Sequence, residues 1–289
     1  MTIKGRGVQS IEVGGRILVA LAAEGRPMML RDLAQKSDLT PAQAHAYLLS
    51  FRRLELVEQD DAGRYRIGSF ALNLGIVRMH SFDPLKIATQ QLSSLAEETG
   101  MMAMIVVLGT RGPTVVYVEE GASQLHVNVR AGTHYSIMGT ASGRIFAAYL
   151  PEKLVRAHIE SELAEGPTQF MVGEPTSFAQ IESTVEAIRA KGYSTTQGVP
   201  VPGVNAISAP VFDHTGQLQL VITLIGPAGG LSTADGSPHV EATLAFCARQ
   251  SSGLGYDPNR VAVDARDEIA PPPGRRRKGA QTIRRSATE

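Results

Sequence analysis

The sequence predicts an α+β chain made of two parts that differ in local pattern. Residues 9–56 carry apolar positions at helical spacing, with short breaks between the segments. Beyond residue 100, apolar runs bounded by Gly, Pro and Asp predict strands mixed with flanking helices. The chain has 289 residues, 43% of them hydrophobic, which suffices for one large or two ordinary domains with a buried core.

Three short helices are expected in the first part. The first is expected to end at Gly25 and to bury Ile11, Ile17, Leu18 and Leu21. The second has an apolar face formed by Leu30, Leu33 and Ala34. The third begins at Thr40, a good N-cap, and Pro41. Its apolar face comprises Ala44, Tyr47, Leu48, Phe51 and Leu54.

A hairpin follows the third helix. Residues 56–59 and 64–68 are short strand-like runs, and the Asp/Gly turn 60–63 separates them. Three helices followed by a two-stranded hairpin make a winged helix-turn-helix layout, which we place at residues 9–68. A helical stretch at 69–81 begins a linker segment, residues 69–83, and a further helix runs from Pro84 to Gly100.

The second part, residues 84–256, is expected to be an α/β sandwich. Strands are predicted at residues 102–109, 114–120, 125–132, 207–213 and 218–226. Helices are predicted at 142–151, where Pro151 stops the helix, at 178–193 and at 240–255. Residues 1–8 are expected to be a flexible N-terminus, and residues 257–289, rich in proline and arginine, a disordered basic tail.

Composition narrows the class of protein. Lysine plus arginine and aspartate plus glutamate number 28 each, so the chain is not basic throughout, although a local basic patch is not excluded. Cys247 is the single cysteine, which rules out an intramolecular disulfide and a cysteine zinc cluster and favours a cytoplasmic location. No signal peptide and no membrane-spanning run are apparent.

The third helix and the hairpin form the first candidate site, for double-stranded DNA. Arginine side chains can neutralise phosphates, and the first residues of a helix in the major groove can contact bases. The expected DNA-binding residues are Ala42, Gln43, His45, Ala46, Arg52, Arg53, Arg64, Tyr65 and Arg66. Gln43 can pair with adenine and His45 can donate to a base edge. Alternatively, these residues form only a solvated helix face, or the winged helix serves dimerisation.

The second candidate site is residues 138–144, MGTASGR. Small residues let a ligand approach the backbone, and the N–H groups at the start of the next helix can bind an anion. The alternative is that the glycines only allow a tight loop. Catalysis has little support, because the sequence lacks paired histidine ligands, a GxSxG elbow and a phosphate-binding loop. We therefore expect neither an enzyme nor a metal or other cofactor.

An ordered set of segments resembles the IclR-type transcriptional regulators. The segments include LRDLAQKSDLTPAQAHAYLL, LELVEQDDAGRYRIG, TVVYVEE, VRAGTHYSIMGTASGR and ISAPVFDHTGQLQLVITLIGP, and the resemblance covers about residues 9–255. It implies a winged helix, a linker helix used in dimerisation and a GAF-like C-terminal domain that binds a small effector. By matching positions, it implies effector contacts from Val127, Tyr135, Ala141, Ser142, Thr196, Val204, Ala206 and Thr223.

Two departures from the family pattern affect these expectations. The start of the third helix has Ala42-Gln43 and Ala46 where relatives often have Ser-Thr and a basic residue, so the operator cannot be inferred from relatives. Residues 195–197 are Thr-Thr-Gln where relatives often have an acidic residue, so the effector can differ.

We expect a ligand-responsive regulator of a metabolic, catabolic operon that senses a small organic or aromatic acid. Its partners would be a palindromic DNA operator and further copies of the chain, as a homodimer or a dimer of dimers. The alternative is an enzyme or an interaction protein that uses the winged helix only to dimerise.

Overall fold

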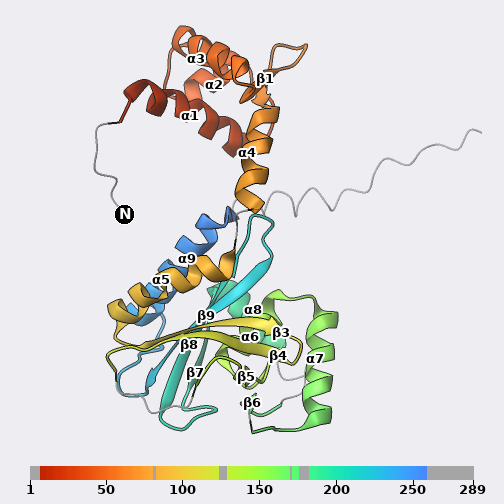
Figure 1. Ribbon diagram of the computed structural model, residues 1–289, viewed down its shortest axis with the longest axis vertical. Coiled ribbons are helices and arrows are strands. Elements are labelled where there is room, and N and C mark those ends of the chain that lie inside the picture. The colour runs from red at the N-terminus through yellow and green to blue at the C-terminus, as the bar shows by residue number, and fades with distance from the viewer. Residues whose placement is uncertain (1–6, 81–82, 124–128, 170, 176–181, 259–289) are drawn as a thin grey trace, which may run out of the picture.

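The computed structural model describes residues 7–80, 83–123, 129–169, 171–175 and 182–258. The segments expected to be a flexible N-terminus and a disordered tail lie outside these residues, apart from residues 7–8 and 257–258. Figure 1 shows a helical N-terminal unit above a larger unit built on a curled sheet, with one helix between them. The predicted α+β class is confirmed.

The N-terminal unit contains α1 (Gln9–Glu24), α2 (Leu30–Lys36), α3 (Pro41–Arg53), β1 (Val57–Gln59) and β2 (Tyr65–Ile67). Gly25 ends α1 in the left-handed conformation, with φ of 68°. β1 and β2 pair antiparallel, and Met28 forms a further bridge to Tyr65. Ile17, Leu33 and Leu48 from the three helices meet Val57 and Tyr65 in one core.

Two positions expected in that core are exposed. Ile11 lies in the first turn of α1 and is 72% exposed. Leu54 follows the last turn of α3 as its C-cap and is 57% exposed. Helical spacing continued to both residues, but each lies at a helix end, where the chain has left the packed face.

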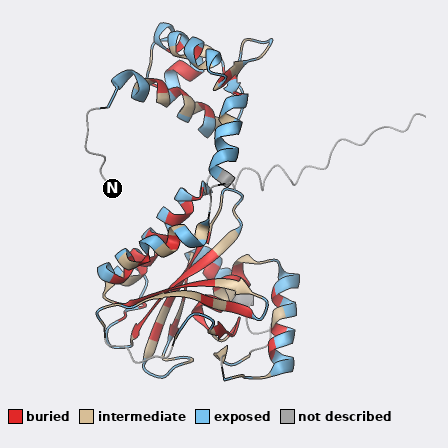
Figure 2. Cartoon of the chain, viewed as in Figure 1, coloured by how far each residue is buried: buried red, intermediate tan, exposed pale blue. Residues whose placement is uncertain are grey.

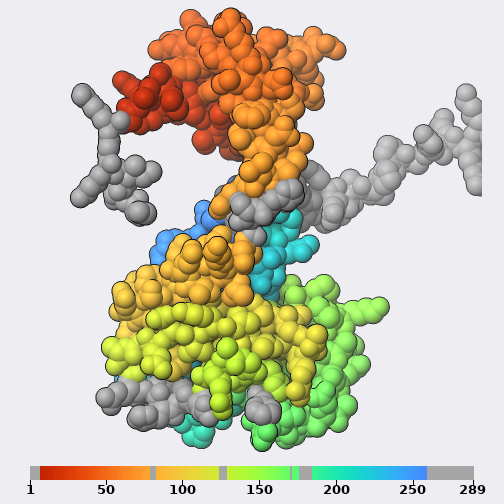
Figure 3. Space-filling view, in the orientation of Figure 1, coloured from red at the N-terminus to blue at the C-terminus, as the bar shows by residue number. Residues whose placement is uncertain are grey.

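Two helices lead into the second unit: α4 (Ser69–His80) and α5 (Pro84–Thr99). α4 is exposed over most of its described length (Figure 2). α5 has the Asp83 carboxylate as its N-cap, which accepts from the Lys86 amide, and Gly100 as its left-handed C-cap. Figure 3 shows α4 as the narrow part of the chain between the two units.

The C-terminal unit is a seven-stranded sheet between helices. Its strand order is β6-β5-β4-β3-β9-β8-β7, antiparallel except for the pair β5 and β6. The strands are β3 (Met102–Gly109), β4 (Gly112–Glu119), β5 (His134–Tyr135), β6 (Met171–Val172), β7 (Ser194–Gln197), β8 (Val204–Phe212) and β9 (Leu218–Pro227). The helices are α6 (Ala141–Tyr149), α7 (Glu152–Glu165), α8 (Glu182–Lys191) and α9 (Pro238–Gly253).

The sheet separates two cores, because successive side chains of a strand point to opposite faces. Ala103 and Ile105 of β3 pack with residues of α5 and α9. Met104 and Val106 of the same strand pack with residues of α6, α7 and α8. Cys247 is buried in the core with α5 and α9, and burial raises the pKa of its thiol, as expected of a packing residue.

Three sequence expectations differ from this unit. Of the strand expected at 125–132, residues 125–128 lie outside the described residues, and residues 129–132 form no strand but end in a turn. Pro151 ends one helix as expected, but it is also the N-cap of α7, which the sequence did not lead us to expect. The helix expected from residue 178 is described only from Glu182. Among the described residues, no helix has the length and apolar character needed to cross a membrane.

Candidate functional site

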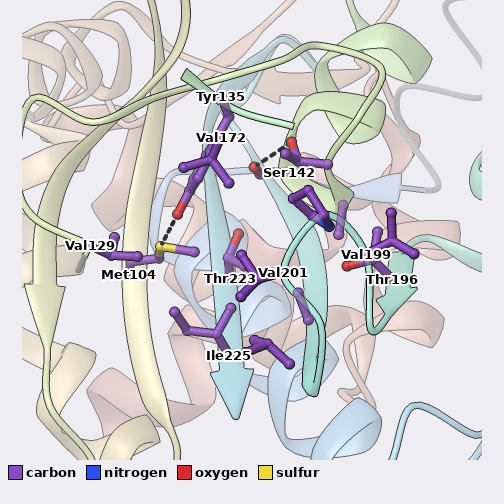
Figure 4. Close-up of a pocket in the computed structure, with 15 residues that line it drawn as sticks. Met104, Val129, Tyr135, Ser142, Val172, Thr196, Val199, Val201, Thr223 and Ile225 are labelled. Carbon is purple, nitrogen blue, oxygen red and sulfur yellow. Dashed lines mark hydrogen bonds between the residues drawn. The ribbon is translucent and has the colours of Figure 1, made fainter. Parts of the chain in front are cut away.

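A cavity opens between the sheet and the start of α6 (Figure 4). Its volume is about 50 Å³, and the empty space is about 450 Å³ when the mouth that opens to solvent is included. The lining is mostly apolar, and no charged side chain of the described residues contributes to it. The lining residues are Met104, Val129, Tyr135, Thr140, Ala141, Ser142, Val172, Thr196, Val199, Pro200, Val201, Val204, Ala206, Thr223 and Ile225.

The polar end of the cavity is the first turn of α6. Thr140 is the N-cap, and its hydroxyl accepts from the Gly143 amide at 3.1 Å. The hydroxyl groups of Thr140 and Ser142 lie 3.4 Å apart. Because α6 begins at Ala141, the amides of its first turn have no carbonyl acceptors in a preceding turn. Such a helix start favours an anionic group on a ligand.

The hydroxyl groups on the strands differ in their hydrogen bonding. The Thr223 hydroxyl lies 2.8 Å from the hydroxyl of Ser208, and both residues are buried. The Tyr135 hydroxyl donates to Met104 Sδ at 3.3 Å, and burial raises the pKa of Tyr135. Thr196 is only 6% exposed, yet within the described part of the chain its hydroxyl has no hydrogen-bond partner. Because Thr196 lines the cavity, its hydroxyl is open to a hydrogen bond from that side.

Seven of the eight residues matched to effector contacts line this one cavity: Tyr135, Ala141, Ser142, Thr196, Val204, Ala206 and Thr223. Val127 lies outside the described residues. The sequence included Thr140 in the candidate segment 138–144, but it did not point to Val172 or Ile225 as part of the site. Ile225 follows the alternation of β9, so the side of the strand could have indicated it. The loop Val199–Pro200–Val201 carries no periodic signal.

The expected DNA-binding face is exposed at the start of α3. Ala42, Gln43, His45 and Ala46 are all exposed. Gln43 also belongs to a capping box that the sequence had not suggested: its Oε1 accepts from the Thr40 amide at 3.0 Å, and the Gln43 amide donates to the Thr40 hydroxyl. The carbonyl end of this side chain is therefore engaged with the helix start, while its amide nitrogen remains available as a donor.

The arginines of this face differ in their partners. Arg64 pairs with Asp60 at 2.8 Å and Arg66 with Glu58 at 3.0 Å, both within the hairpin. A hydrogen bond from the Arg64 amide also lowers the pKa of Asp60. Arg52 donates to Gln59 Oε1 at 2.9 Å. Arg53 has no ion pair with any described residue, so its charge is the most available of the four.

Tyr65 lies in the interior rather than on this face. It is 4% exposed and packs with α1, α2 and α3 in the core of the N-terminal unit. The expectation that Tyr65 lies beside the two arginines on a DNA-facing surface is therefore corrected: residues of a strand alternate in direction, so Arg64 and Arg66 point outward while Tyr65 points inward.

Two family models match the two units. The model described as "IclR helix-turn-helix domain" matches residues 10–61, and "Bacterial transcriptional regulator IclR C-terminal" matches residues 77–253. The chain belongs to the IclR family. Its members are DNA-binding transcriptional regulators rather than enzymes, in agreement with the sequence-based expectation.

Individual relatives agree with this membership. The chain is 28% identical over 254 residues to the glycerol operon regulatory protein of Streptomyces coelicolor, covering 86% of this chain and 96% of that protein. It is 24% identical to the HTH-type transcriptional repressor AllR of Klebsiella pneumoniae, covering 88% of this chain and 92% of the repressor. The crystal structure of Pseudomonas aeruginosa HmgR shares 34% identity with it at a TM-score of 0.78, covering 87% of this chain and 100% of HmgR.

Proposed function

We propose that this IclR-family protein regulates a catabolic operon in response to a small organic acid bound in the cavity beside α6. The observation that carries the proposal is the convergence of seven effector positions, drawn from β5, α6, β7, β8 and β9, on one apolar cavity. Two relatives, named for a glycerol operon and as a repressor, support the operon role.

The lining of the cavity favours an acid with a single carboxylate. An anion at the first turn of α6 gains the partial positive charge of the helix start, but no described lysine, arginine or histidine lines the cavity to neutralise a second charge. Valine, isoleucine, methionine and tyrosine side chains form the remaining walls, which suit an aliphatic or aromatic body. The free hydroxyl of Thr196 offers a hydrogen bond to a further polar group.

Ligand binding can be tested by thermal unfolding with monocarboxylates (acetate, benzoate and phenylacetate) and with succinate as the dicarboxylate. We expect at least one monocarboxylate to raise the melting temperature. A ligand that binds only the folded state and is present at 100 times its Kd adds about 2.7 kcal/mol to the free energy of unfolding. Ser142→Phe fills the cavity and is expected to abolish this shift while DNA binding is retained. Stabilisation by none of the four acids, or an unchanged dose-response in Ser142→Phe, contradicts the proposed pocket.

On the DNA side, we propose that a homodimer, or a dimer of dimers, places two copies of α3 in successive major grooves of a palindromic operator. Exposed apolar side chains on α1 and α4 support self-association, among them Ile11, Val19, Leu72 and Val77, each more than 60% exposed. Isolated exposed apolar residues are ordinary, but a group of them on two helices favours an interface.

DNA binding can be tested with a fragment that flanks the gene, titrated at several salt concentrations. Between residues 7 and 68, lysine plus arginine and aspartate plus glutamate number eight each, so few cations are free to meet phosphates. We expect Arg53→Ala to weaken binding to all sequences and to reduce the salt slope by about 1, because one phosphate is no longer neutralised. Glu58→Gln, which frees Arg66, is expected to strengthen binding. No affinity for any such fragment at low salt contradicts the DNA-binding role.

A further inference from the structure

Glu162 of α7 is a buried carboxylate that neither the family resemblance nor the cavity lining includes. It is 4% exposed, although acidic side chains are almost never fully buried without partners. Its partners lie on the loop of residues 136–140, which connects β5 to α6 and so ends at the polar end of the cavity. We call these residues the effector loop.

Both oxygens of the Glu162 carboxylate are bound to the effector loop. Oε1 accepts from the Ile137 amide at 2.7 Å, and Oε2 lies 3.0 Å from the Ser136 hydroxyl, which acts as the donor. Burial raises the pKa of Glu162 above its ordinary value, and the two hydrogen bonds partly oppose this rise. The ionised carboxylate is the form that accepts both hydrogen bonds, and hydrogen bonds to a charged group are stronger than neutral ones.

Ser136 connects this carboxylate to the start of α6. Its hydroxyl oxygen accepts from the Gly139 amide at 3.0 Å, and its carbonyl accepts from the hydroxyl of Thr140 at 3.0 Å. Thr140 in turn caps α6 through the Gly143 amide. A continuous set of hydrogen bonds therefore runs from Glu162 through the effector loop to the first turn of α6.

The effector loop has little room to take another position while α6 stays in place. A Cβ atom added at Gly143 would lie 2.3 Å from the Ser136 carbonyl oxygen and 2.5 Å from that of Ile137. At Gly139 it would lie 2.8 Å from the carbonyl oxygen of Glu174. The backbone of the loop thus rests directly on α6, so a shift of the loop moves Ala141 and Ser142, which line the cavity.

We propose that Glu162 is a positioning residue that holds the effector loop and the α6 start in the geometry that binds the effector. The inference rests on the proposed effector function of the cavity. Glu162 does not line the cavity, so it acts through Ser136, Ile137 and Thr140. α7 then has a role in effector binding, although the sequence pattern did not predict that helix.

Two substitutions separate positioning from the charge of Glu162. Glu162→Ala leaves the Ile137 amide without its acceptor, and it leaves the Glu174 carbonyl as the remaining acceptor for the Ser136 hydroxyl. Glu162→Gln keeps the shape: its carbonyl accepts from Ile137, and its amide donates to Ser136, whose hydroxyl then donates to the Glu174 carbonyl, 3.1 Å away. Glu165→Ala is the matched control, because Glu165 lies one turn later on α7 and its contacts, with Arg111 and the Ser161 hydroxyl, are at the surface.

The deciding experiment is amide hydrogen exchange on the ligand-free full chain. We expect Glu162→Ala to speed exchange of residues 136–143 by about tenfold or more, because removing a hydrogen bond to a charged group costs about 1.5–3 kcal/mol. β8 and β9 should stay protected, and Glu162→Gln and Glu165→Ala should match the wild type. Unchanged exchange at 136–143 in Glu162→Ala, or an equal increase across β8 and β9, overturns the proposal.

A second measurement follows the change in binding of the flanking DNA fragment, in either direction, as benzoate, phenylacetate or acetate is added. In Glu162→Ala we expect the midpoint to move to higher acid concentration while ligand-free DNA affinity is unchanged, and Glu162→Gln to restore the midpoint. An unchanged midpoint beside faster exchange overturns the link to effector affinity. If no acid acts on the wild type, the proposed function fails, whereas the exchange experiment still decides whether Glu162 holds the loop.

Discussion

Thr196 and Thr223 show how the same residue type has different roles on neighbouring strands. Thr223 on β9 shares its hydrogen bond with Ser208 of β8, opposite it in the strand register. Thr196 on β7 faces Ala206, which has no polar side chain to offer. The hydroxyl of Thr196 is therefore available to a ligand, while that of Thr223 is already used within the protein. The sequence identified both as candidate contacts but could not distinguish them, because the difference depends on the strand partner.

Thr223→Val is expected to destabilise the protein rather than only alter ligand binding. It keeps the shape of the side chain but leaves the buried Ser208 hydroxyl unpaired, at a cost of about 1–3 kcal/mol. Adding Ser208→Ala removes the unpaired group, so the double variant should recover part of the loss. Urea unfolding of the wild type, both single variants and the double variant measures this. Additive losses would show that the pair does not interact.

The raised pKa of Glu162 predicts how the stability of the folded protein changes with pH. Burial raises its pKa above the ordinary value of 4.5, so the folded state holds the proton more tightly than the unfolded state. Its contribution to stability is greatest below the unfolded pKa and is lost as pH rises through the folded pKa. Since glutamine does not titrate, the melting temperature of Glu162→Gln relative to wild type should rise between pH 4 and pH 7. A constant difference over that range would contradict the raised pKa.

At the scale of elements, helix starts and strand alternation were the features that the sequence predicted well. α3 begins after its N-cap Thr40 and α1 ends at its C-cap Gly25, as expected, because helix caps are determined by local chemistry. α7 was missed because Pro151 was interpreted only as a stop, whereas proline also suits the residue before a helix begins. β5 and β6 have two residues each, too few for a period to appear. Seven cavity residues were predicted through family resemblance, but the capping role of Gln43 and the partners of the arginines depend on side-chain geometry.

The capping box of α3 makes a prediction about Gln43. Gln43→Ala should lose helix stability as well as base contact, so its effect on DNA binding is ambiguous. Gln43→Glu keeps the capping acceptor and suits a helix start, but it has no donor for a base and adds a negative charge near phosphates. We expect Gln43→Glu to retain the melting temperature and to bind the cognate fragment more weakly, by about 1–3 kcal/mol if Gln43 pairs with a base. Undiminished binding would exclude Gln43 from the DNA contact.

The exposed side of α4 predicts a dimer contact. Leu72→Glu replaces an apolar side chain that is 65% exposed, so the fold should survive, whereas a contact between copies should be repelled. The control is Leu163→Glu on α7, where the leucine is 52% exposed and lies in the other unit. Sedimentation should show that the Leu72→Glu variant dissociates into single chains, whereas the Leu163→Glu variant stays associated like the wild type. If both variants stay associated to the same degree, α4 does not form the interface.

At the scale of the whole molecule, the structure separates the two proposed sites and joins them through α4 and α5. The cavity lies in the C-terminal unit, and the start of α3 lies in the N-terminal unit (Figure 1). A contact crosses this joint, from the Arg78 guanidinium of α4 to the Gly253 carbonyl at the end of α9, at 3.5 Å. In the proposed function, regulation would therefore be a coupling between two separate binding equilibria rather than competition for one surface.

Such coupling is reciprocal, which makes it measurable from either side. If an acid changes the Kd for DNA by a given factor, DNA must change the Kd for that acid by the same factor. We expect typical coupling of about 5-fold to 150-fold. Isothermal titration of the acid with and without the DNA fragment, compared with DNA titrations with and without the acid, checks this. Unequal factors would show that a third state, such as a change in association, takes part.

The alternation of β3 has a consequence for engineering this protein as a biosensor. Met104 faces the cavity, while Ala103 and Ile105 on either side of it pack against the helices that include α5, which follows the linker. In the proposed function, effector contacts would lie on one face of β3, and the contacts with the helices next to the linker lie on the other face, one peptide apart. A library that varies only the cavity-facing positions can search for new analytes and leave the transmitting face untouched, so specificity and output can be optimised in separate rounds.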